Sequence, residues 1–431
     1  MRGLEPRIFR ESRLGKLHSV IPFKELASHF RYFKSNKPQG CKAFFTLEGG
    51  LGLMFLKHEL GFSDEKLIER LNSDWQLQLF CGIRLLGRKI KDKDIVGRWR
   101  RFFGTHMDMD ALQDKLAQHW STDMDNTDIL LDDATCYESD VKYPTDVKLL
   151  YDCSEWLFKQ IMERSNLLGL RAPKKDHYNK LRKRMRSYLM MKKKRRKKRK
   201  RLIKSLLHWV DKWQQHLQGI LDKGRAFNIG LKDRFYKRLR TTRIVYFQQL
   251  YMFENNVRKV ANRIVSLYKP YLRPIVRGKE RKPVEFGAKA HISQVDGINF
   301  IEHLNFNAFH EGNRMLLSLA NHQKRFGKCS KYGADRIYAT NRNRKSCKAL
   351  DIQTSFVRKG AAAKDETQRQ QMRAILSKER STRLEGSFGT EKRHYLFGRV
   401  RARLETTEIA WIFFSIHTAN AVRMSKKPRA A

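Results

Sequence analysis

The chain has 431 residues, with 91 Lys and Arg against 44 Asp and Glu and a net charge of +47. A chain of this length buries a sizeable core and predicts two or three domains. Its hydrophobic content of 41% excludes a disordered polycation, and its excess of positive charge predicts a polyanionic partner. Nucleic acid is the first candidate for that partner, and an anionic membrane surface is the second.

Targeting and cysteine patterns favour a cytoplasmic protein. The start, MRGLEPRIFRESRLGK, has no apolar segment of the kind that a signal peptide needs, and the longest apolar runs are too short to span a bilayer. The cysteines lie far apart without a C-x-x-C pair, which argues against a zinc module and fits a reducing compartment. They are Cys41, Cys81, Cys136, Cys153, Cys329 and Cys347.

The first part of the chain is predicted to be helical after a basic start. Residues 1–40 are basic, contain three prolines and are expected to be loop-like, whereas 41–115 is predicted to be a helical domain. Within FSDEKLIERL, Ser63 is suited to cap a helix, because acid follows it and leucine and isoleucine recur at helical spacing. This domain is expected to bind DNA or to pair protomers, with a purely structural helix pair as the alternative.

A strand followed by a long helical region comes next. DILLDDATC, at 128–136, is an apolar run with the length of a buried strand, and it ends in acid. A basic helical insertion is predicted at about 150–280, and within it residues 171–204 carry 19 Lys and Arg and one acid. Further on, Ile244, Phe247 and Tyr251 recur at helical spacing, and we expect them in the core rather than as a base-stacking platform.

Strand patterns return near residue 283 and then alternate with helical patterns. PVEFGAKAHIS, GINFIEHLNF, FGKCSKYGAD and QTSFVRKG are predicted strands, and the tail from 364 to 422 is predicted to be helical. The fold class is therefore an α/β core that is interrupted by a large helical insertion after its first strand. A basic tail, 423–431, ends the chain.

Acidic residues follow two of the predicted strands and recur in the tail. They lie in LLDDAT, in YGADRIY and in RLEGSFGTEKRHY. Three carboxylates on separate elements suit two Mg²⁺ ions, which prefer oxygen ligands and can clamp the attacking and leaving oxygens of a phosphoryl displacement. The alternative explanation is helix caps and solvated loop charges.

Four segments resemble DDE transposases of bacterial insertion sequences, in particular the IS-five-type branch. They are DATCYESDVKYPTDVKLL, VDGINFIEHLNFNAFHEGNRM, YGADRIYATNRNRK and RLEGSFGTEKRHYLFGRVRARL, and the resemblance covers roughly 45–110 and 128–420. It implies a ribonuclease-H-like mixed sheet over 126–422, preceded by a small all-α domain. It also implies two Mg²⁺ ions, for which Mn²⁺ can substitute, held by two Asp and one Glu.

The resemblance assigns the acids residue by residue. The family places its first Asp directly before a small residue and a Thr, which selects Asp133 over Asp132. Because neighbouring strand residues face opposite sides, only one of the two can point into the site, and Asp132 is left to shape the field or to cap a turn. Asp335 and Glu385 match the second and third acids. The remaining acids, Glu138, Asp140 and Asp146, are expected to bind turns or nearby bases.

Basic residues are assigned to DNA. Lys392 lies seven residues after Glu385, on the same helical face if the helix persists through two glycines. The family's Arg, four residues before the Glu, is Ser381 here, and its Tyr is Lys378, so Arg380 and Arg383 are the candidate replacements. Arg336 and the run KKKRRKKRKR complete the predicted DNA contacts: Lys192, Lys193, Lys194, Arg195, Arg196, Lys197, Lys198, Arg199, Lys200 and Arg201.

The predicted function is that of a transposase. It would bind double-stranded DNA, at transposon ends and target, as a homodimer or higher oligomer in a nucleoid-associated synaptic complex, with no membrane contact. The alternative is a non-catalytic DNA- or RNA-binding protein derived from a transposase. A ribosome-associated or nucleolar polycation fits less well, because the chain is too hydrophobic for one.

Overall fold

The computed structural model describes residues 4–33, 44–226, 232–276, 283–361 and 365–427. The chain forms two compact units, and each is described by itself. Unit 1 consists of Met1–Asp140 and Gly287–Ala431, and unit 2 is Val141–Phe286. The second unit therefore interrupts the first along the sequence.

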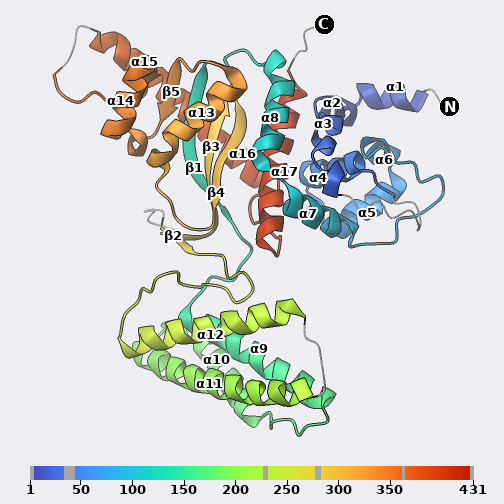
Figure 1. The fold of residues 1–431 in the computed structure, drawn as a ribbon, viewed down its shortest axis with the longest axis vertical. Helices are drawn as coiled ribbons and strands as arrows, with labels where there is room; N and C mark the ends of the chain where they lie inside the picture. Colours follow the sequence, from blue (N-terminus) through green and yellow to red (C-terminus); the bar gives the residue numbers. More distant parts are fainter. Residues whose placement is uncertain (1–3, 34–43, 227–231, 277–282, 362–364, 428–431) are drawn as a thin grey trace. The chain divides into compact units, whose positions relative to one another are not determined.

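Unit 1 is built around a curled mixed sheet (Figure 1). In it, β3 runs antiparallel to both β1 and β4, whereas β5 runs parallel to β1 and β6 parallel to β5. The strands are β1 (Ile129–Glu138), β3 (Val284–Val295), β4 (Ile298–Asn305), β5 (Lys331–Ala334) and β6 (Gln353–Thr354). Each lies in a segment that the sequence predicted to be a strand. This mixed α/β architecture is compatible with a ribonuclease-H-like domain.

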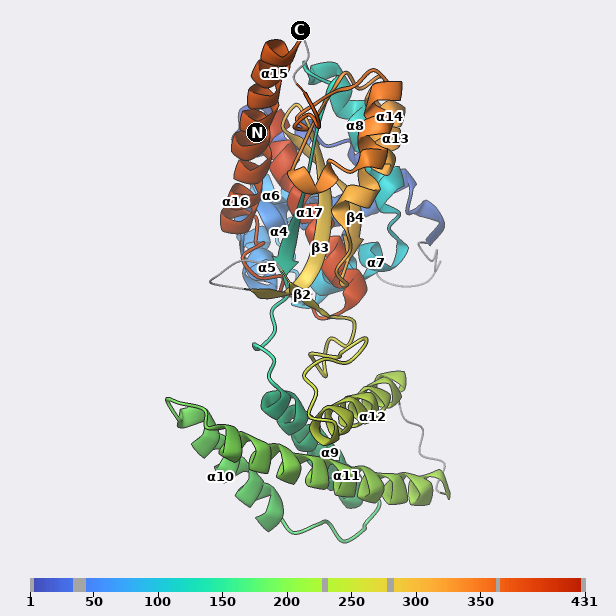
Figure 2. The same ribbon diagram turned by 90° about the vertical axis from the view of Figure 1, so that its left-hand side faces the viewer.

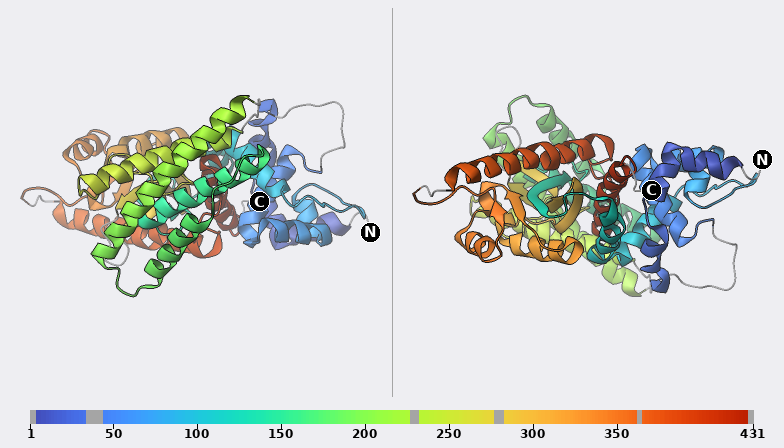
Figure 3. Two further views of the ribbon diagram at one scale, coloured as in Figure 1. Left: turned by 90° about the horizontal axis from the view of Figure 1, so that it is seen from below. Right: turned by 90° about the horizontal axis from the view of Figure 1, so that it is seen from above.

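Helices cover both faces of the sheet. Figure 2 shows α15 (Glu366–Glu379) and α16 (Glu385–His394) on one side of the strands, with α13 (Met315–Phe326) and α14 (Asn341–Ala349) on the other. The view from above in Figure 3 shows the same layering. The first face is the one on which the acids of α16 meet β1.

The beginning of the chain is helical, so the expectation of a loop-like 1–40 is wrong for residues 4–33. Its elements are α1 (Leu4–Glu11), α2 (Arg13–Ser19), α3 (Phe23–Ser28) and η1 (Arg31–Phe33). The prolines misled the prediction, because Pro6 lies in the first turn of α1 and Pro22 is the N-cap of α3, where no helical N–H is lost. Residues 34–43, which include Cys41, lie outside the described residues.

The following helices are α4 (Leu47–Leu60), α5 (Asp64–Ser73), α6 (Trp75–Phe80), α7 (Ile95–His106) and α8 (Met109–Trp120). Ser63 caps α5 as predicted, because its hydroxyl accepts a hydrogen bond from the N–H of Lys66 at 3.1 Å. Of these helices, α4 and α7 pack against the C-terminal helix α17 (Glu405–Met424), where Phe414 contacts the rings of Phe55 and Phe103. They therefore share the core of unit 1.

Unit 2 is mainly a helical bundle of α9 (Asp146–Leu167), α10 (Asp176–Met190), α11 (Arg196–Ala226) and α12 (Asp233–Glu254). A short strand, β2 (Pro274–Val276), pairs with the first residues of β3. The prediction that Ile244, Phe247 and Tyr251 belong to the core is wrong, because they are 39%, 64% and 53% exposed. Among the described helices of both units, none has the length and apolarity that a membrane span requires.

Candidate active site

The strand pairing brings two of the predicted acids to neighbouring positions. Asp132 on β1 pairs in parallel register with Ala334, the last residue of β5. The next residues along the two chains are Asp133 and Asp335. Because adjacent strands lie about 4.8 Å apart, residues distant in sequence meet at one edge of the sheet.

Arg380 links the first and third acids. Its Nη1 lies 2.7 Å from Oδ2 of Asp133 and 2.6 Å from Oε1 of Glu385. Burial raises the pKa of Asp133, and the charges of Glu385 and Asp335 raise it further, while the Ala134 N–H and Arg380 oppose the rise. All three predicted acids therefore share one electrostatic neighbourhood.

A π-helical turn accounts for the position of Arg380. Residues Arg380–Leu384 form this turn between α15 and α16, and the N–H of Glu385 donates to the carbonyl of Arg380 five residues earlier. In an α-helix, a residue four positions earlier lies on the same face, and a π turn adds one residue to that spacing. Arg380 thus lies over Glu385 as the residue four positions earlier does in a regular helix.

The π turn therefore shifts the register of the family pattern by one residue. Sequence spacing placed the family's Arg at Ser381, whereas the side chain that reaches the acids is Arg380. The other candidate, Arg383, pairs with Glu379 at 2.8 Å. The spacing rule assumes a regular α-helix and does not include the extra residue of a π turn, so it could not identify Arg380 as the arginine that contacts the two acids.

Lys392 also reaches β1. Helix α16 continues through Gly386 and Gly389, so the expected helical continuity from Glu385 to Lys392 is present. The Lys392 ammonium group donates a 3.0 Å hydrogen bond to Oγ1 of Thr135, two residues beyond Asp133 on the same strand. Arg336 is exposed and follows Asp335 directly at the start of η4 (Arg336–Tyr338).

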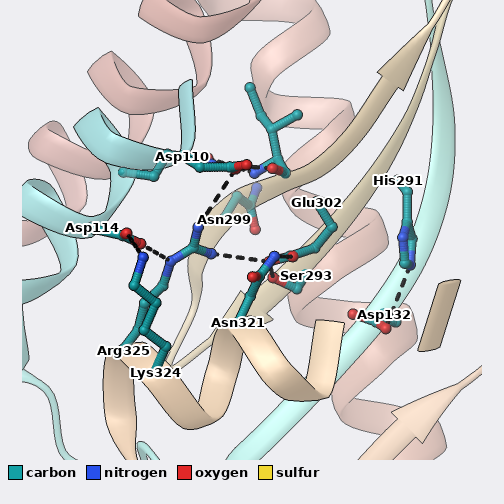
Figure 4. A network of polar contacts seen from close by, with 12 residues as sticks. Asp110, Asp114, Asp132, His291, Ser293, Asn299, Glu302, Asn321, Lys324 and Arg325 are labelled. Carbon is teal, nitrogen blue, oxygen red and sulfur yellow. Dashed lines mark hydrogen bonds and ion pairs between the residues drawn. The ribbon is translucent and has the colours of Figure 1, made fainter. Parts of the chain in front are cut away.

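Asp132 faces the opposite side of β1. It is fully buried, accepts a 2.8 Å hydrogen bond from the hydroxyl of Tyr332, and lies 3.4 Å from Nε2 of His291 (Figure 4). Burial, together with the charge of Asp132, raises the pKa of Tyr332. Because side chains alternate along the strand, Asp133 faces α16 and Asp132 faces the core. The contacts of Asp132 are with Tyr332 and His291, so it does not cap a turn.

Asp140 and Asp146 pair with bases as expected, and one further acid near the site was not predicted from the sequence. Asp140 pairs with Arg399 at 3.5 Å, and Asp146 pairs with Arg263. The unpredicted acid is Glu391 on α16, which is buried and accepts hydrogen bonds from Tyr137 at 2.8 Å and Asn299 at 2.7 Å. Burial raises its pKa to about 7, and it anchors α16 to β1 and β4.

The basic run lies in unit 2 and is exposed throughout. It spans the connection from α10 and the first residues of α11, which begins at Arg196. Two members make local contacts: Lys194 donates to the carbonyls of Leu189 and Met191 at the end of α10, and the Lys200 ammonium group lies 5.8 Å from the centre of the Phe253 ring. The other side chains have the solvent exposure that phosphate contacts require.

Asp133 and Glu385 share one cationic partner, Arg380, and offer carboxylate oxygens beside it. Within the described ranges, no group of three or more His, Cys, Asp or Glu has a metal-binding arrangement. The Arg380 guanidinium instead supplies positive charge between Asp133 and Glu385. Carboxylate oxygens that already gather around a cation fit the ligand preference of Mg²⁺.

Two family models match the chain. One, described as "Transposase DDE domain", matches residues 333–420, and the other, "Transposase domain (DUF772)", matches residues 2–102. Both descriptions are those of transposase domains, and the first is that of a DDE domain. The first match contains Asp335, Glu385 and Lys392, and the second includes the N-terminal helices that the sequence did not predict. These matches are consistent with a DDE transposase of an insertion sequence and do not distinguish the IS-five-type branch. No curated protein and no solved structure matches the chain significantly.

Proposed function

We propose that this protein is a metal-dependent DNA transposase. It binds the terminal inverted repeats of its element, cleaves the DNA at their ends and transfers the strands to a target. Asp133, Asp335 and Glu385 are the proposed metal ligands. The observation that carries the proposal is the double ion pair of Arg380 with Asp133 and Glu385, beside the strand end that bears Asp335.

The finer fold assignment belongs to the same proposal. An antiparallel β1–β3–β4 meander, extended by β5 and β6 in parallel with β1, supports a ribonuclease-H-like catalytic domain. The N-terminal helices would bind DNA or pair protomers. Unit 2 is the insertion after the first core strand.

Two Mg²⁺ ions, or Mn²⁺ in their place, would activate the attacking oxygen and stabilise the leaving oxygen. The chain's own residues would position the substrate. Arg380 can fork two phosphate oxygens, since its guanidinium presents paired donors, whereas Lys392 offers a single point charge. Arg336 would hold the DNA beside Asp335. Arg383, which is exposed on the π turn that carries Arg380, would be a further DNA contact.

The partner is double-stranded DNA, with synapsis of two ends in a homodimer or higher oligomer. The net charge of +47 supports a polyanion as partner. The basic run, Lys192 to Arg201, would contact phosphates. Cytoplasmic, nucleoid-associated localisation and the absence of membrane contact are part of the proposal.

The test replaces each acid by its amide. Each amide variant, Asp133→Asn, Asp335→Asn or Glu385→Gln, should cleave DNA that carries the element's ends roughly a hundredfold more slowly or worse. Loss of a residue that only hydrogen-bonds to a metal ligand typically costs up to about a hundredfold, and loss of a ligand itself should cost at least as much. Binding of the same DNA without metal should persist, since loss of a negative charge does not weaken attraction to phosphate.

Asp140→Asn is the matched control, because Asp140 follows β1 closely and pairs with Arg399 outside the acid group. Its cleavage rate should stay near that of the wild type. A ligand variant that still cleaves at the wild-type rate would remove that residue from the site. Binding of the ends without any cleavage by the wild-type protein, in Mg²⁺ and in Mn²⁺, would favour the non-catalytic DNA- or RNA-binding alternative.

A further inference from the structure

Helix α12 in unit 2 has two distinct faces. One is buried in the bundle and carries Phe235, Leu239, Val245 and Met252. The other is exposed and carries large apolar side chains at positions that recur along the helix: Tyr236 at 46%, Ile244 at 39%, Phe247 at 64% and Tyr251 at 53% exposed. We call these four residues, with Arg240 and Arg243, the α12 stripe.

Two arginines separate Tyr236 from the other rings of the α12 stripe. Arg240 and Arg243 are exposed between Tyr236 and Phe247, and Arg243 is oriented by a 2.7 Å hydrogen bond to Gln218 on α11. At 1.5 Å per residue, Phe247 and Tyr251 lie about 6 Å apart along the axis, and Tyr236 lies about 16 Å from Phe247. Arg240 and Arg243 thus separate Tyr236 from Phe247 and Tyr251, so the stripe as a whole is not one continuous apolar patch of the kind found in a packed protein interface.

Charge identifies the occupant as an anion. Unit 2 contains 41 Lys and Arg against 11 Asp and Glu, which gives it +30 of the chain's +47. No acid occurs between Asp233 and Glu254, the two ends of α12. A second copy of this unit would be repelled, whereas a polyanion with flat apolar groups would match both the cations and the rings.

We propose that the α12 stripe binds single-stranded DNA by stacking unpaired bases on Tyr236, Phe247 and Tyr251, with phosphates held by Arg240 and Arg243. A duplex hides its base faces within the stack, so the rings select unpaired strands. The proposal rests on the proposed function in one respect, namely that cleavage at transposon ends exposes unpaired DNA. It assigns unit 2 a role beyond general attraction to phosphate.

The experiment measures binding by the full chain without metal, by fluorescence anisotropy. The probes are a 20-nucleotide oligo(dT), the same backbone made of abasic sites, and a 20-base-pair duplex. Phe247→Ala with Tyr251→Ala should lower oligo(dT) affinity by about tenfold or more, because each stacked base is worth roughly 5- to 150-fold. Affinity for the abasic strand and the duplex should change by less than about twofold, since their phosphates remain available.

Leu189→Ala with Met190→Ala is the matched control, because these side chains are exposed on α10 of the same unit, 42% and 85% respectively. It should leave all three affinities unchanged. An oligo(dT) containing 5-iodouracil should also photocrosslink to a peptide that contains Phe247 or Tyr251.

Equal losses on the three probes would overturn the proposal, as would crosslinks that avoid α12. A change in the oligomeric state of the DNA-free protein on removal of the rings would assign the stripe to self-association instead. The measurement needs neither metal nor cleavage. Its failure is therefore distinguishable from failure of the proposed catalytic site, which the amide variants test.

Discussion

Glu391 makes the stability of the site region depend on pH. Its carboxyl is buried against Tyr137 and Asn299, and its pKa rises from an ordinary 4.5 to about 7. The folded state therefore keeps a proton that the unfolded state releases between pH 4.5 and 7. The protonated Glu391 therefore contributes to the free energy of unfolding in full below pH 4.5. This contribution is lost as the pH rises to 7, and it is absent above that pH.

The magnitude follows from the size of the shift. A rise from 4.5 to about 7 corresponds to about 3 kcal/mol, since each unit is worth 1.36 kcal/mol. Solvent does not screen the group, because Glu391 is only 1% exposed. Glu391→Gln mimics the protonated carboxyl and can still exchange hydrogen bonds with Tyr137 and Asn299. The variant should thus match the wild type at pH 4.5 and exceed its stability by up to about 3 kcal/mol at pH 7.5.

Hydrogen exchange with mass spectrometry gives the local stability of β1 and α16. Comparison of variant and wild type at the same pH cancels the intrinsic exchange rates. Protection of these peptides in Glu391→Gln should be up to about a hundredfold higher at pH 7.5 and equal at pH 4.5. Glu405→Gln, an exposed acid on α17, should behave as the wild type at both values. A variant that is less protected at pH 7.5, or a ratio that does not change with pH, would refute the reasoning.

Two further predictions concern DNA contacts. Lys392→Ala should slow end cleavage more than it weakens DNA binding, because the Lys392 ammonium group donates to Thr135, two residues beyond Asp133. Cleavage kinetics and fluorescence anisotropy on the same DNA would compare the two losses. Equal small losses would mean that Lys392 is general surface charge. Replacement of residues 192–201 by Gln or Ser should flatten the log–log salt dependence of DNA affinity by about 4–5 if the run neutralises about five phosphates. An unchanged slope would mean that the run does not touch DNA, and a loss confined to terminal-repeat DNA would mean that it reads sequence.

The sequence predicted those elements of the fold whose hydrophobic pattern is compatible with only one kind of secondary structure. DILLDDATC forms most of β1, as its apolar run predicts for a strand that pairs with a neighbour on each side, here β3 and β5. Because side chains alternate along the strand, Asp133 faces α16 and Asp132 lies in the core. Periodicity failed at α12, because a helix with two periodic faces does not reveal which one is buried. The π turn before Glu385 was missed for a different reason, because regular helical spacing does not include the extra residue that a π turn adds.

The positive charges of unit 2 and the cations beside the acids of unit 1 are expected to serve different steps, namely DNA binding and cleavage. Asp133 and Glu385, whose charges act on each other together with that of Asp335, would repel a phosphodiester unless cations lie within hydrogen-bond reach. Arg380 contacts Asp133 and Glu385, and Lys392 contacts Thr135 on β1. The +30 of unit 2 is carried by residues other than these two contacts, and it adds sequence-independent attraction to phosphate. Unit 2 should therefore govern affinity and its salt dependence, whereas Arg380 and Lys392 should govern the rate of cleavage. A variant of the basic run that loses affinity at low salt but cleaves saturating DNA at the wild-type rate would be the direct consequence of this division.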